Sequence, residues 1–432
     1  MTVTVHKDVV CTFCGALCDD LEMHVEDNRV IDVKNVCGIG RSKALHGDND
    51  KPECRVRGQQ ATLEQAYDAA AEILSRAKSP LVYGFSSTVA EANRVGVELA
   101  EILRGGLDNC SSYCHGPGVL ARQHVGLPTC TLGEAKNRAD LVVFWGANPM
   151  ESHMRHFSRY SVQAKGMYTP LGRKDRKMVV VDVRPTPSSK NADLFFQVIP
   201  GSDYEIATVL RALVCELPLP TLADDSLVGG VPLSKWKELV ALFKACKYGV
   251  VFFGIGLTQS QGKDLNIEQL IRLVGDCNRH TRVYAMPMRG HANVNGNNQV
   301  FVWQTGYPLA ISFNRGYPRF NPGEFSVIDM LNRGDVDAAL IVATDPAAHL
   351  PHTAVEALKK IPTIVLDPVN SLTTAWADVV IPVATSGLSA AGTYYRMDNV
   401  PIRLRKILDC EWPADLEVLQ NIKERVLDAK DH

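Results

Sequence analysis

The sequence lacks any apolar run of about 18 residues, the length that a helix needs to cross a bilayer, so we expect no membrane span. It also lacks an excess of one charge, because 46 Lys and Arg stand against 48 Asp and Glu and the formal net charge is -2. Nucleic-acid binding draws on a basic surface that displaces counterions, so we expect no nucleic-acid partner. No repeat of fixed period and no low-complexity tract is visible.

The N-terminus lacks the basic head and apolar core of a secretory signal, since MTVTVHKDVVCTFCGALCDD carries acids and cysteines there. We therefore expect a cytoplasmic protein. Cysteine is too sparse for a disulfide scaffold, at 12 of 432 residues, but it is unevenly spread. Without a secretory signal, clustered cysteines indicate metal ligands or redox groups before disulfides. Five lie near the N-terminus: Cys11, Cys14, Cys18, Cys37 and Cys54.

A chain of 432 residues has room for roughly two to three domains, and 46% hydrophobic with 22% charged residues is typical of a globular enzyme. Residues 1–55 are predicted to form a small N-terminal domain. Within it, β-like runs at 21–25 and 29–33 flank the turn residues 26–28, which predicts a hairpin. Thr62 is positioned to cap a helix that follows.

Short apolar runs rich in β-branched residues alternate with helix-like stretches between residues 56 and 400. This pattern predicts parallel strands buried on both faces and joined by crossover helices, so the fold class is α/β. We expect two interleaved Rossmann-like units over 56–400, with a break nearest residues 200–245, and a C-terminal tail or helix over 401–432. The runs are SPLVYGF, ADLVVFWG, KMVVVDV, YGVVFFGIG, RVYAMPM, DAALIVAT, IPTIVLDP and ADVVIP.

The N-terminal cysteines have the spacing Cys11-x2-Cys14-x3-Cys18, with Cys37 remote. Thiolates hold either tetrahedral zinc or an iron–sulfur cluster. Structural zinc usually takes paired C-x2-C knuckles, whereas three close ligands and a distant fourth fit the corners of a cubane. We therefore predict a [4Fe–4S] cluster. Buried small hydrophobes are the alternative, and Cys54 is an alternative fourth ligand.

A second motif is Tyr113-Cys114-His115-Gly116-Pro117, which precedes a predicted helix over 119–125. A strand-to-helix loop of this kind is where α/β sheets place ligand-contacting residues. A thiol at a helix N-terminus is expected to have a lowered pKa and to be present as thiolate. Cys114 is a nucleophile, a metal ligand or simply packed.

Five loops at the ends of predicted strands carry small residues, asparagine, aspartate or threonine. Small residues let backbone N–H groups approach phosphate, and a helix N-terminus adds a positive dipole. An aspartate at a strand tip can accept from a sugar hydroxyl or from the donor edge of guanine. Five such loops predict one long polyphosphorylated ligand, or two. The candidate residues are Gly146, Asn148, Asp182, Arg184, Gly256, Thr258, Thr344, Asp345 and Asp367.

Together these motifs resemble the molybdopterin or tungstopterin guanine dinucleotide oxidoreductases, specifically those of the formate dehydrogenase and DMSO reductase type. Segment 288–296 resembles the stretch that contributes their active-site arginine, and segments 377–382 and 392–396 resemble a later pterin-binding stretch that includes Thr393. Within the family, the resemblance is strongest to the B subunits of formylmethanofuran dehydrogenase from methanogenic archaea. The tracts CTFCGALCDD, CHGPGVLA, GEAKNRADLVVFWGANPM, MRGHANVNGNNQV and YRMDNVPIRLRK carry it, from about residue 8 to residue 410.

The resemblance implies roles for the candidate residues. Cys11, Cys14, Cys18 and Cys37 would hold the [4Fe–4S] cluster. Cys114 would ligate tungsten or molybdenum beside two pterin guanine dinucleotides and a sulfido ligand, and His115 and Arg289 would flank the open face of the metal. The implied reaction is two-electron reduction of carbon dioxide to formate, with electrons from a ferredoxin-type donor through the cluster. The choice between tungsten and molybdenum stays open, since both accept these donors.

One departure from the family concerns the link between cluster and pterin. Many formate dehydrogenases have a lysine directly after the last cluster cysteine, whereas Gly38 follows Cys37 here. The nearest lysine is Lys43, which is therefore the candidate relay. The alternative is a solvated surface lysine.

A second departure is at the C-terminus, where larger relatives continue into a β-barrel that covers the pterins and this chain has a helix-like stretch instead. The resemblance then implies several partners: one that supplies the barrel, an amidohydrolase (the A subunit) that condenses formate with methanofuran, a C subunit, and polyferredoxin-type iron–sulfur subunits. Rival interpretations are a stand-alone formate dehydrogenase or nitrate reductase chain, and a non-catalytic scaffold subunit of a formyltransferase/hydrolase complex. The scaffold is expected to lack the cluster and metal-ligand cysteines, which are present here.

Overall fold

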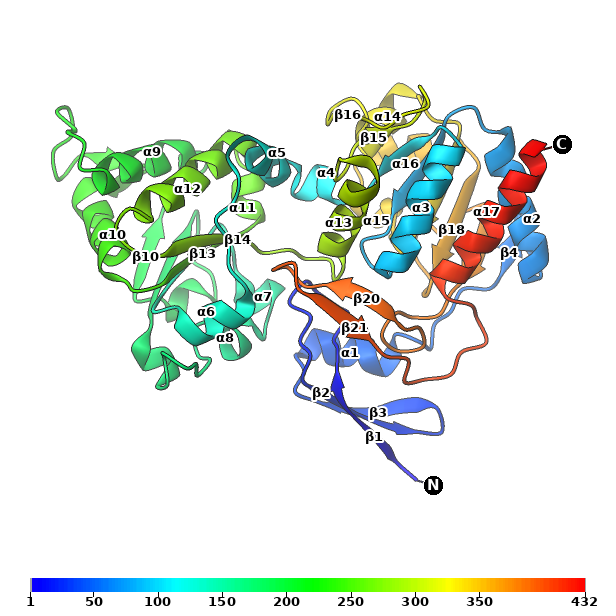
Figure 1. Ribbon diagram of the computed structural model, residues 1–432, viewed down its shortest axis with the longest axis horizontal. Coiled ribbons are helices and arrows are strands. Elements are labelled where there is room, and N and C mark those ends of the chain that lie inside the picture. The colour runs from blue at the N-terminus through cyan, green and yellow to red at the C-terminus, as the bar shows by residue number, and fades with distance from the viewer. Residues whose placement is uncertain (1, 432) are drawn as a thin grey trace. The chain divides into compact units, whose positions relative to one another are not determined.

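The computed structural model describes residues 2–431, and the chain divides into two compact units (Figure 1). Unit 1 comprises Met1–Tyr113 and His291–His432, and unit 2 comprises Cys114–Gly290. The break expected within residues 200–245 is wrong. That stretch lies inside unit 2, where its Pro- and Gly-rich part forms a hairpin of β11 (Leu227–Val228) and β12 (Val231–Pro232) beside α10 (Leu233–Ala245).

The N-terminal part of unit 1 is a three-stranded antiparallel sheet of β1 (Thr4–Val9), β2 (Leu21–Glu26) and β3 (Arg29–Lys34), followed by α1 (Gly38–His46). The predicted hairpin is confirmed. Its turn residues Asp27 and Asn28 have φ angles of 47° and 59°, which matches the twist of the two strands that they join. Leu21, Met23, Val30 and Val33 are buried, so one face of this small sheet packs inward.

The main sheet of unit 1 has nine strands in the order β16-β15-β7-β6-β17-β18-β19-β4-β5. Its five central strands, β7-β6-β17-β18-β19, are parallel. Counted along the chain, they have the order 2-1-3-4-5, which is typical of a doubly wound fold. Four predicted runs are confirmed here as β6, β17, β18 and β19, whereas three-residue β7 left no recognisable run. The strands are β4 (Arg55–Val56), β5 (Gln59–Gln60), β6 (Pro80–Gly84), β7 (Gly106–Asp108), β15 (Ile311–Ser312), β16 (Arg319–Phe320), β17 (Ala338–Val342), β18 (Thr363–Asp367) and β19 (Val379–Pro382).

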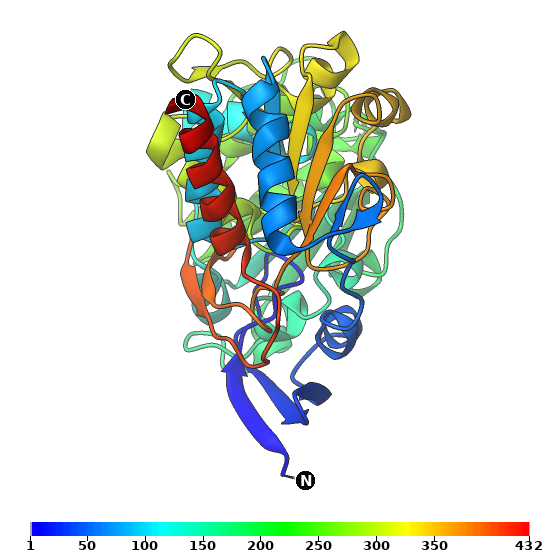
Figure 2. The same cartoon turned by 90° about the vertical axis from the view of Figure 1, so that its right-hand side faces the viewer.

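Helices cover both faces of this sheet. Alternate strand residues such as Val82, Leu340 and Ile364 pack against α2 (Leu63–Arg76), α3 (Ala90–Ile102) and α17 (Asp415–Asp431). The intervening residues, among them Leu81 and Ile341, pack against α14 (Val327–Arg333) and α16 (His352–Leu358). Figure 2 shows α17 alongside α2, whose predicted cap is confirmed as a capping box of Thr62 and Gln65. Unit 1 also contains α4 (Ser111–Cys114, which crosses into unit 2), α13 (Val294–Thr305), α15 (Pro346–His349), β20 (Gly392–Tyr395) and β21 (Pro401–Leu404).

Unit 2 is built on a five-stranded parallel sheet in the order β10-β9-β8-β13-β14, the 3-2-1-4-5 order of a dinucleotide-binding fold. The other four predicted runs are confirmed as β8, β9, β13 and β14. The strands are β8 (Leu141–Trp145), β9 (Lys177–Asp182), β10 (Leu194–Gln197), β13 (Gly249–Phe253) and β14 (Val283–Pro287). The helices are α5 (Gly116–Val125), α6 (Leu132–Arg138), α7 (Pro149–Ser152), α8 (His156–Arg159), α9 (Asp203–Val214), α11 (Ile255–Thr258) and α12 (Lys263–Cys277), with short 3-10 turns at Gly172–Asp175 and Ser189–Asn191.

The domain boundaries expected at residues 55 and 400 stay predictions. The second falls between β20 and β21, which pair with each other, and the helix that follows packs on α2 and α3. Within residues 2–431, every helix is too short or too polar to span a bilayer.

Candidate functional site

The geometry of both sheets predicts where ligands bind. In an open α/β sheet, ligands bind at the carboxyl ends of the strands where the strand order reverses. In unit 2 this point lies between β8 and β13, and in unit 1 it lies between β6 and β17. The predicted loops follow β8 and β13 in unit 2, so Gly146 and Gly256 lie close together. In unit 1 they follow β17 and β18, so Thr344 and Asp367 lie at the same edge of the sheet.

Two glycine loops meet at the switch point of unit 2. Gly256 N–H donates to the carbonyl of Gly146 over 3.1 Å, and a Cβ on Gly256 would lie 2.7 Å from Gly146 Cα. Gly146 has a φ of 55°, which favours glycine. No side chain fits between these loops, so their backbone N–H groups are left accessible to an anionic ligand. The helices that start here, α7 and α11, have four residues each and add little dipole.

A methyl group at Gly256 tests this close approach. We expect Gly256→Ala to push the two loops apart, lowering the free energy of unfolding by about 1–3 kcal/mol because backbone atoms must move. The matched control is Gly275→Ala in α12, where a Cβ meets nothing within 4 Å. That change should raise the free energy of unfolding by about 0.5–1 kcal/mol. Chemical denaturation measures both; equal effects would contradict the packing argument.

The same loop arrangement occurs once in each unit. In unit 2, β8 is followed by Gly146 and then by Asn148, whose Oδ1 accepts from Ser188 Oγ over 2.6 Å. In unit 1, β17 is followed by Ala343 at a φ of 48° and then by Asp345, whose Oδ1 accepts from Thr373 Oγ1 over 2.6 Å. Each hydroxyl stands six positions after an aspartate that ends the neighbouring strand, Asp182 or Asp367. This repeat has no signature in the sequence alone, because its two copies share few residue types.

The remaining predicted residues of unit 2 have different surroundings. Asp182 is half-buried and accepts from its neighbour Val183 N–H over 2.8 Å; burial raises its pKa. Arg184 is exposed at the same edge of the sheet and is free to meet an anion. Thr258 is buried, and its hydroxyl donates to the carbonyl of Cys114 over 2.9 Å. Thr258 therefore ties the cysteine segment to the glycine loop, and its hydroxyl is not directed at a phosphate.

Cys114, His115 and Arg289 all belong to unit 2. Cys114 ends the short helix α4, and His115 caps α5 with its carbonyl accepting from Val119 N–H over 3.0 Å. Arg289 is 1% exposed, and its positive charge acts on the Cys114 thiol. His153 donates to the carbonyl of Arg289 over 2.8 Å and so fixes the backbone that carries the guanidinium. Sequence reasoning missed His153, which has no motif around it.

The expectation that the Cys114 thiol has a lowered pKa is wrong. Burial raises its pKa, and the Arg289 charge opposes this only in part. The helix dipole expected to lower the pKa is also not available, because Cys114 stands at the end of α4 rather than in the first turn of α5, which begins at Gly116. In the protein alone the thiol is therefore held in its neutral form, and a bound metal ion would be needed to displace the proton.

The four cysteines near the N-terminus converge around one loop. Cys11 N–H donates to the carbonyl of Cys18 over 2.8 Å, which closes the loop 11–18. Cys37 caps α1, and its Sγ accepts from Gly40 N–H over 3.4 Å. A Cβ on Gly40 would lie 3.0 Å from the Cys11 sulfur and 3.6 Å from the Cys37 sulfur, so both border the same space. Burial raises the pKa of Cys14 to about 12, and the other three thiols act on it in the same direction.

The structure places the four thiols near one loop, but within residues 2–431 no three His, Cys, Asp or Glu side chains lie closely enough together to hold a metal ion. Cys54 is buried apart from them, with its Sγ donating to the carbonyl of Thr62 over 3.7 Å, so it is packed in the core.

Three distant segments of unit 1 hold the cysteine loop. Cys14 forms a β-bridge with His291, and the Thr12 hydroxyl donates to the carbonyl of Ser386 over 3.1 Å. Met397 N–H, in the turn between β20 and β21, donates to the carbonyl of Gly15 over 2.8 Å. The position of the loop is therefore set by the main body of unit 1.

Lys43 lies between the cysteine loop and a cavity of about 330 Å³ in unit 1. Its Nζ donates to the carbonyl of Thr12 over 3.3 Å, and burial lowers its pKa. The lysine is thus not a solvated surface residue. The cavity lies at the carboxyl ends of the parallel strands and is also lined by His291, Thr344, Asp345, Asp367, Tyr394 and Asp415.

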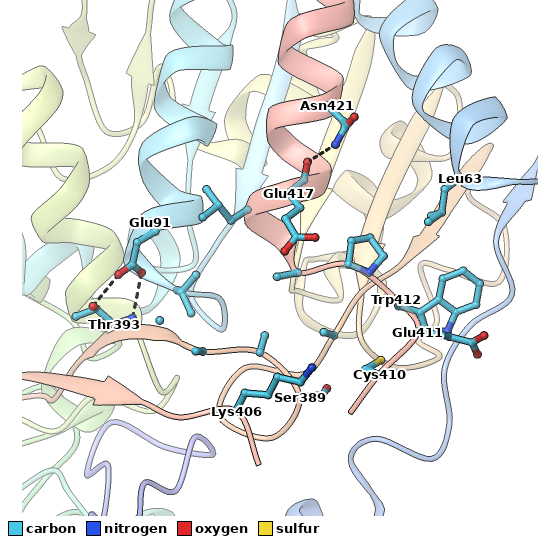
Figure 3. A pocket seen from close by; sticks show the side chains of 18 of the residues that line it. Leu63, Glu91, Ser389, Thr393, Lys406, Cys410, Glu411, Trp412, Glu417 and Asn421 are labelled. Atoms are coloured by element: carbon cyan, nitrogen blue, oxygen red, sulfur yellow. Dashed lines mark hydrogen bonds between the residues drawn. The ribbon is translucent and has the colours of Figure 1, made fainter. Parts of the chain in front are cut away.

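Thr393 stands apart from the other predicted residues. Its backbone N–H and its hydroxyl donate to the Glu91 carboxylate over 3.0 and 2.7 Å, as Figure 3 shows. It lines a separate groove of about 1090 Å³ that also contains Lys406, Trp412 and Glu417. The structure does not bring Thr393 into the cavity that holds Asp367.

Two doubly wound units, with glycine loops at the switch point of unit 2, are typical of dinucleotide-binding α/β proteins. The sequence profile of the molybdopterin oxidoreductases matches residues 50–425, and the chain belongs to this family. It is 46% identical over 415 residues to the B subunit of the tungsten-containing formylmethanofuran dehydrogenase 2 of Methanocaldococcus jannaschii, covering 94% of each chain. Within the family it therefore groups with the B subunits of formylmethanofuran dehydrogenase, and the resemblance found in the sequence is confirmed.

Two further comparisons agree with this assignment. The protein of the same name from Methanococcus maripaludis is 43% identical over 436 residues, covering 99% of this chain and 100% of that one. Among solved structures, a chain of the formyltransferase/hydrolase complex of Methylorubrum extorquens superposes with a TM-score of 0.72 at 22% identity, over 88% of this chain and 100% of that chain. At this identity the likeness concerns the fold alone.

Proposed function

We propose that this chain is the catalytic redox subunit of a formylmethanofuran dehydrogenase and that it reduces carbon dioxide to formate at a tungsten or molybdenum bis(pterin guanine dinucleotide) site. The observation that carries the proposal is one half-buried thiol, Cys114, on which the charge of the buried guanidinium of Arg289 acts. A thiolate is a suitable ligand for a soft metal, and a guanidinium binds the carboxylate of the product. The names of the relatives from Methanocaldococcus jannaschii and Methanococcus maripaludis agree with it.

The chain's own residues have distinct roles in this reaction, which takes up two electrons and one proton. When bound, the metal with its dithiolenes and sulfido ligand would supply the electron-pair chemistry. Cys114 would ligate the metal, and the bond from Thr258 would keep its backbone in place. Arg289, held through its carbonyl by His153, would fix carbon dioxide and formate in one orientation with its planar guanidinium. His115, buried at the next position, would hold a proton near the substrate.

Electrons would enter through a [4Fe–4S] cluster on Cys11, Cys14, Cys18 and Cys37. Support comes from the common space beside Gly40 and from the mutual effect of the thiols on the pKa of Cys14. Lys43 would link this cluster to a pterin, because its ammonium group bonds the cysteine loop and its side chain lines the adjacent cavity.

The repeated loop arrangement supports two dinucleotides rather than one. Unit 2 would bind one through Gly146, Asn148, Asp182, Arg184 and Gly256, and unit 1 would bind the other through Thr344, Asp345 and Asp367. In each unit an aspartate at a strand tip stands where a ribose hydroxyl is commonly bound. Thr258 and Thr393 would act indirectly, since their hydroxyls are bonded to Cys114 and Glu91.

We infer that the chain works in a cytoplasmic complex. The superposable chain from Methylorubrum extorquens belongs to a formyltransferase/hydrolase complex. By analogy, formate made here would pass to an amidohydrolase, the A subunit, which condenses it with methanofuran. Further partners would be one that supplies a pterin-covering β-barrel, a C subunit, and polyferredoxin-type iron–sulfur subunits that deliver electrons.

Metal analysis of the anaerobically purified complex tests the proposal most directly. We expect four iron atoms and one tungsten or molybdenum per chain, as a [4Fe–4S] cluster and one metal site require. With a low-potential one-electron donor, the same preparation should convert carbon dioxide to formate. A preparation free of iron, tungsten and molybdenum would instead identify a non-catalytic scaffold subunit, and metal with formate made in the absence of any partner would identify a stand-alone formate dehydrogenase.

A further inference from the structure

The loop 160–176, between α8 and β9 in unit 2, holds three large apolar side chains in water. Met167 is 76% exposed, Tyr168 60% and Leu171 62%. Single exposed apolar residues are common on any protein, but three within five residues form a patch of the kind that marks a contact surface. The loop precedes β9 and therefore lies at the amino ends of the parallel strands, whereas the glycine loops follow the strands at their carboxyl ends. The proposed reaction uses no residue of this loop.

Hydrogen bonds fix the backbone of the loop to the end of α6. The buried Arg176 guanidinium donates to the carbonyl of Ala139, which caps α6, over 2.5 Å, and to the carbonyl of Ala164 in the loop over 2.9 Å. Tyr168 N–H donates to the carbonyl of Asn137 over 2.9 Å. The apolar side chains are thus presented to solvent by an ordered backbone. A surface that is already ordered loses little conformational entropy when a partner binds.

A cavity of about 400 Å³ adjoins the loop, and Tyr168 and Pro170 form part of its lining. Three cations line it as well: Arg138, Lys247 and Arg282. The Arg138 guanidinium lies 5.1 Å from the centroid of the Tyr168 ring, a cation–π contact. Within residues 2–431, no carboxylate forms an ion pair with any of the three cations. Their charges are therefore available to a partner.

The two acids of the lining are bonded to the backbone rather than to these cations. Asp140 accepts from the N–H groups of Lys247 and Tyr248 over 2.9 Å each. Asp175 accepts from Leu171 N–H over 2.7 Å. The loop adds two exposed lysines, Lys165 and Lys174, so cations predominate around the apolar patch. Such a surface is complementary to an acidic partner that also has apolar residues.

We propose that the loop and its cavity form a docking surface for another protein subunit of the complex. That subunit would place an aspartate or glutamate side chain in the cavity beside the three cations and cover the apolar side chains of the loop. The concave shape favours a protein over a lipid surface, because a cavity admits a projecting carboxylate and a guanidinium binds it with a planar fork. The inference rests on the proposed function only for the existence of a complex.

Carbodiimide cross-linking of the anaerobically purified complex tests the proposal, because this reagent joins a lysine ammonium to a carboxylate that it contacts. We expect Lys247 to be linked to an aspartate or glutamate of another subunit, which mass spectrometry identifies. Lys235 is the matched control: its ammonium bonds Glu238 over 2.7 Å, so it should be linked within this chain only. The proposal is overturned if Lys247 is linked to no other subunit, or only to a second copy of this chain.

Reversal of one charge tests the same contact by affinity. We expect Lys247→Glu to raise at least tenfold the concentration at which the cross-linked subunit dissociates from this chain, since like charges would then face each other. The variant should also lose much of the salt dependence of the wild-type contact. Native mass spectrometry on dilution measures both effects. Lys235→Glu makes the same change of charge at an exposed position outside the cavity and should leave dissociation unaltered. Wild-type dissociation of Lys247→Glu at every salt concentration would refute the assignment.

A membrane surface is the alternative that the same variant detects. Vesicles of phosphatidylcholine and anionic phosphatidylglycerol should sediment no more of the wild-type chain than of Lys247→Glu. Sedimentation of the wild type alone would replace the protein partner by a lipid surface and overturn the proposal. Absence of tungsten and molybdenum from the complex concerns the proposed function and leaves the cross-links of Lys247 untouched. Absence of these cross-links from a metal-containing complex concerns only the docking surface.

Discussion

Replacing Cys114 by alanine should abolish carbon dioxide reduction while leaving the iron–sulfur signal intact. Cys114 would ligate the metal, so its loss should lower the rate of formate production on the order of a thousandfold or more. Cys11, Cys14, Cys18 and Cys37, the proposed cluster ligands, belong to unit 1, and contacts within that unit hold the cysteine loop, whereas Cys114 begins unit 2. Formate assays and electron paramagnetic resonance on the same anaerobic preparation measure the two effects separately.

Cys130→Ala is the matched control for this prediction. Cys130 is 6% exposed in unit 2, and no role in the reaction is assigned to it. Its replacement should change the free energy of unfolding by about 1 kcal/mol and leave the rate of formate production unaltered. Full activity in Cys114→Ala, or loss of the iron–sulfur signal in that variant alone, would contradict the separate roles of the two cysteine motifs.

The secondary structure of the two sheets was predictable because buried parallel strands carry continuous β-branched runs. All eight predicted runs became strands, and all of them except the edge strand β14 have a neighbouring strand on each side. The parallel strands that were missed, β7 and β10, have three and four residues, too few to establish a pattern. The division into units was not predictable from composition. The Pro- and Gly-rich stretch near residue 220 is an excursion within unit 2, whereas the boundary after Tyr113 falls inside the short helix α4 and the boundary after Gly290 follows β14.

Some residues of the candidate site could be predicted from short sequence motifs, whereas others are brought to the site only by the fold. The cysteines, the glycine loops and the aspartates at the strand ends could be predicted from short motifs, because each of these features is formed by residues that are close together in the sequence. The residues that support these features by hydrogen bonds could be identified only from the folded structure. Ser188 and Thr373 support the loops from six positions beyond an aspartate, His153 fixes Arg289 across 136 positions, and Asp415 reaches its cavity from the last helix. The lowered pKa expected for Cys114 was wrong for the same reason, since burial is a property of the whole unit.

Replacing Cys37 by alanine should remove the iron from the chain. Cys37 is the remote member of the four cysteines, and its sulfur borders the same space beside Gly40 as that of Cys11. Three cysteines alone leave one corner of a cubane without a thiolate, so we expect the iron content to fall from about four atoms per chain to fewer than one after anaerobic purification. Formate production with an external one-electron donor should fall with it, because electrons would lose their entry point. Iron analysis and electron paramagnetic resonance report the loss directly.

Cys54→Ala tests whether Cys54, rather than Cys37, is the fourth ligand of the proposed cluster. Cys54 is buried in the core of unit 1 and donates to the carbonyl of Thr62, and its thiol is not among the groups that act on Cys14. Its replacement should keep all four iron atoms and cost about 1 kcal/mol of stability through lost packing. Retention of iron in Cys37→Ala together with its loss in Cys54→Ala would exchange the two roles. Retention of iron in both variants would show that neither Cys37 nor Cys54 is required to hold it, and would refute the assignment of Cys37 as the fourth ligand.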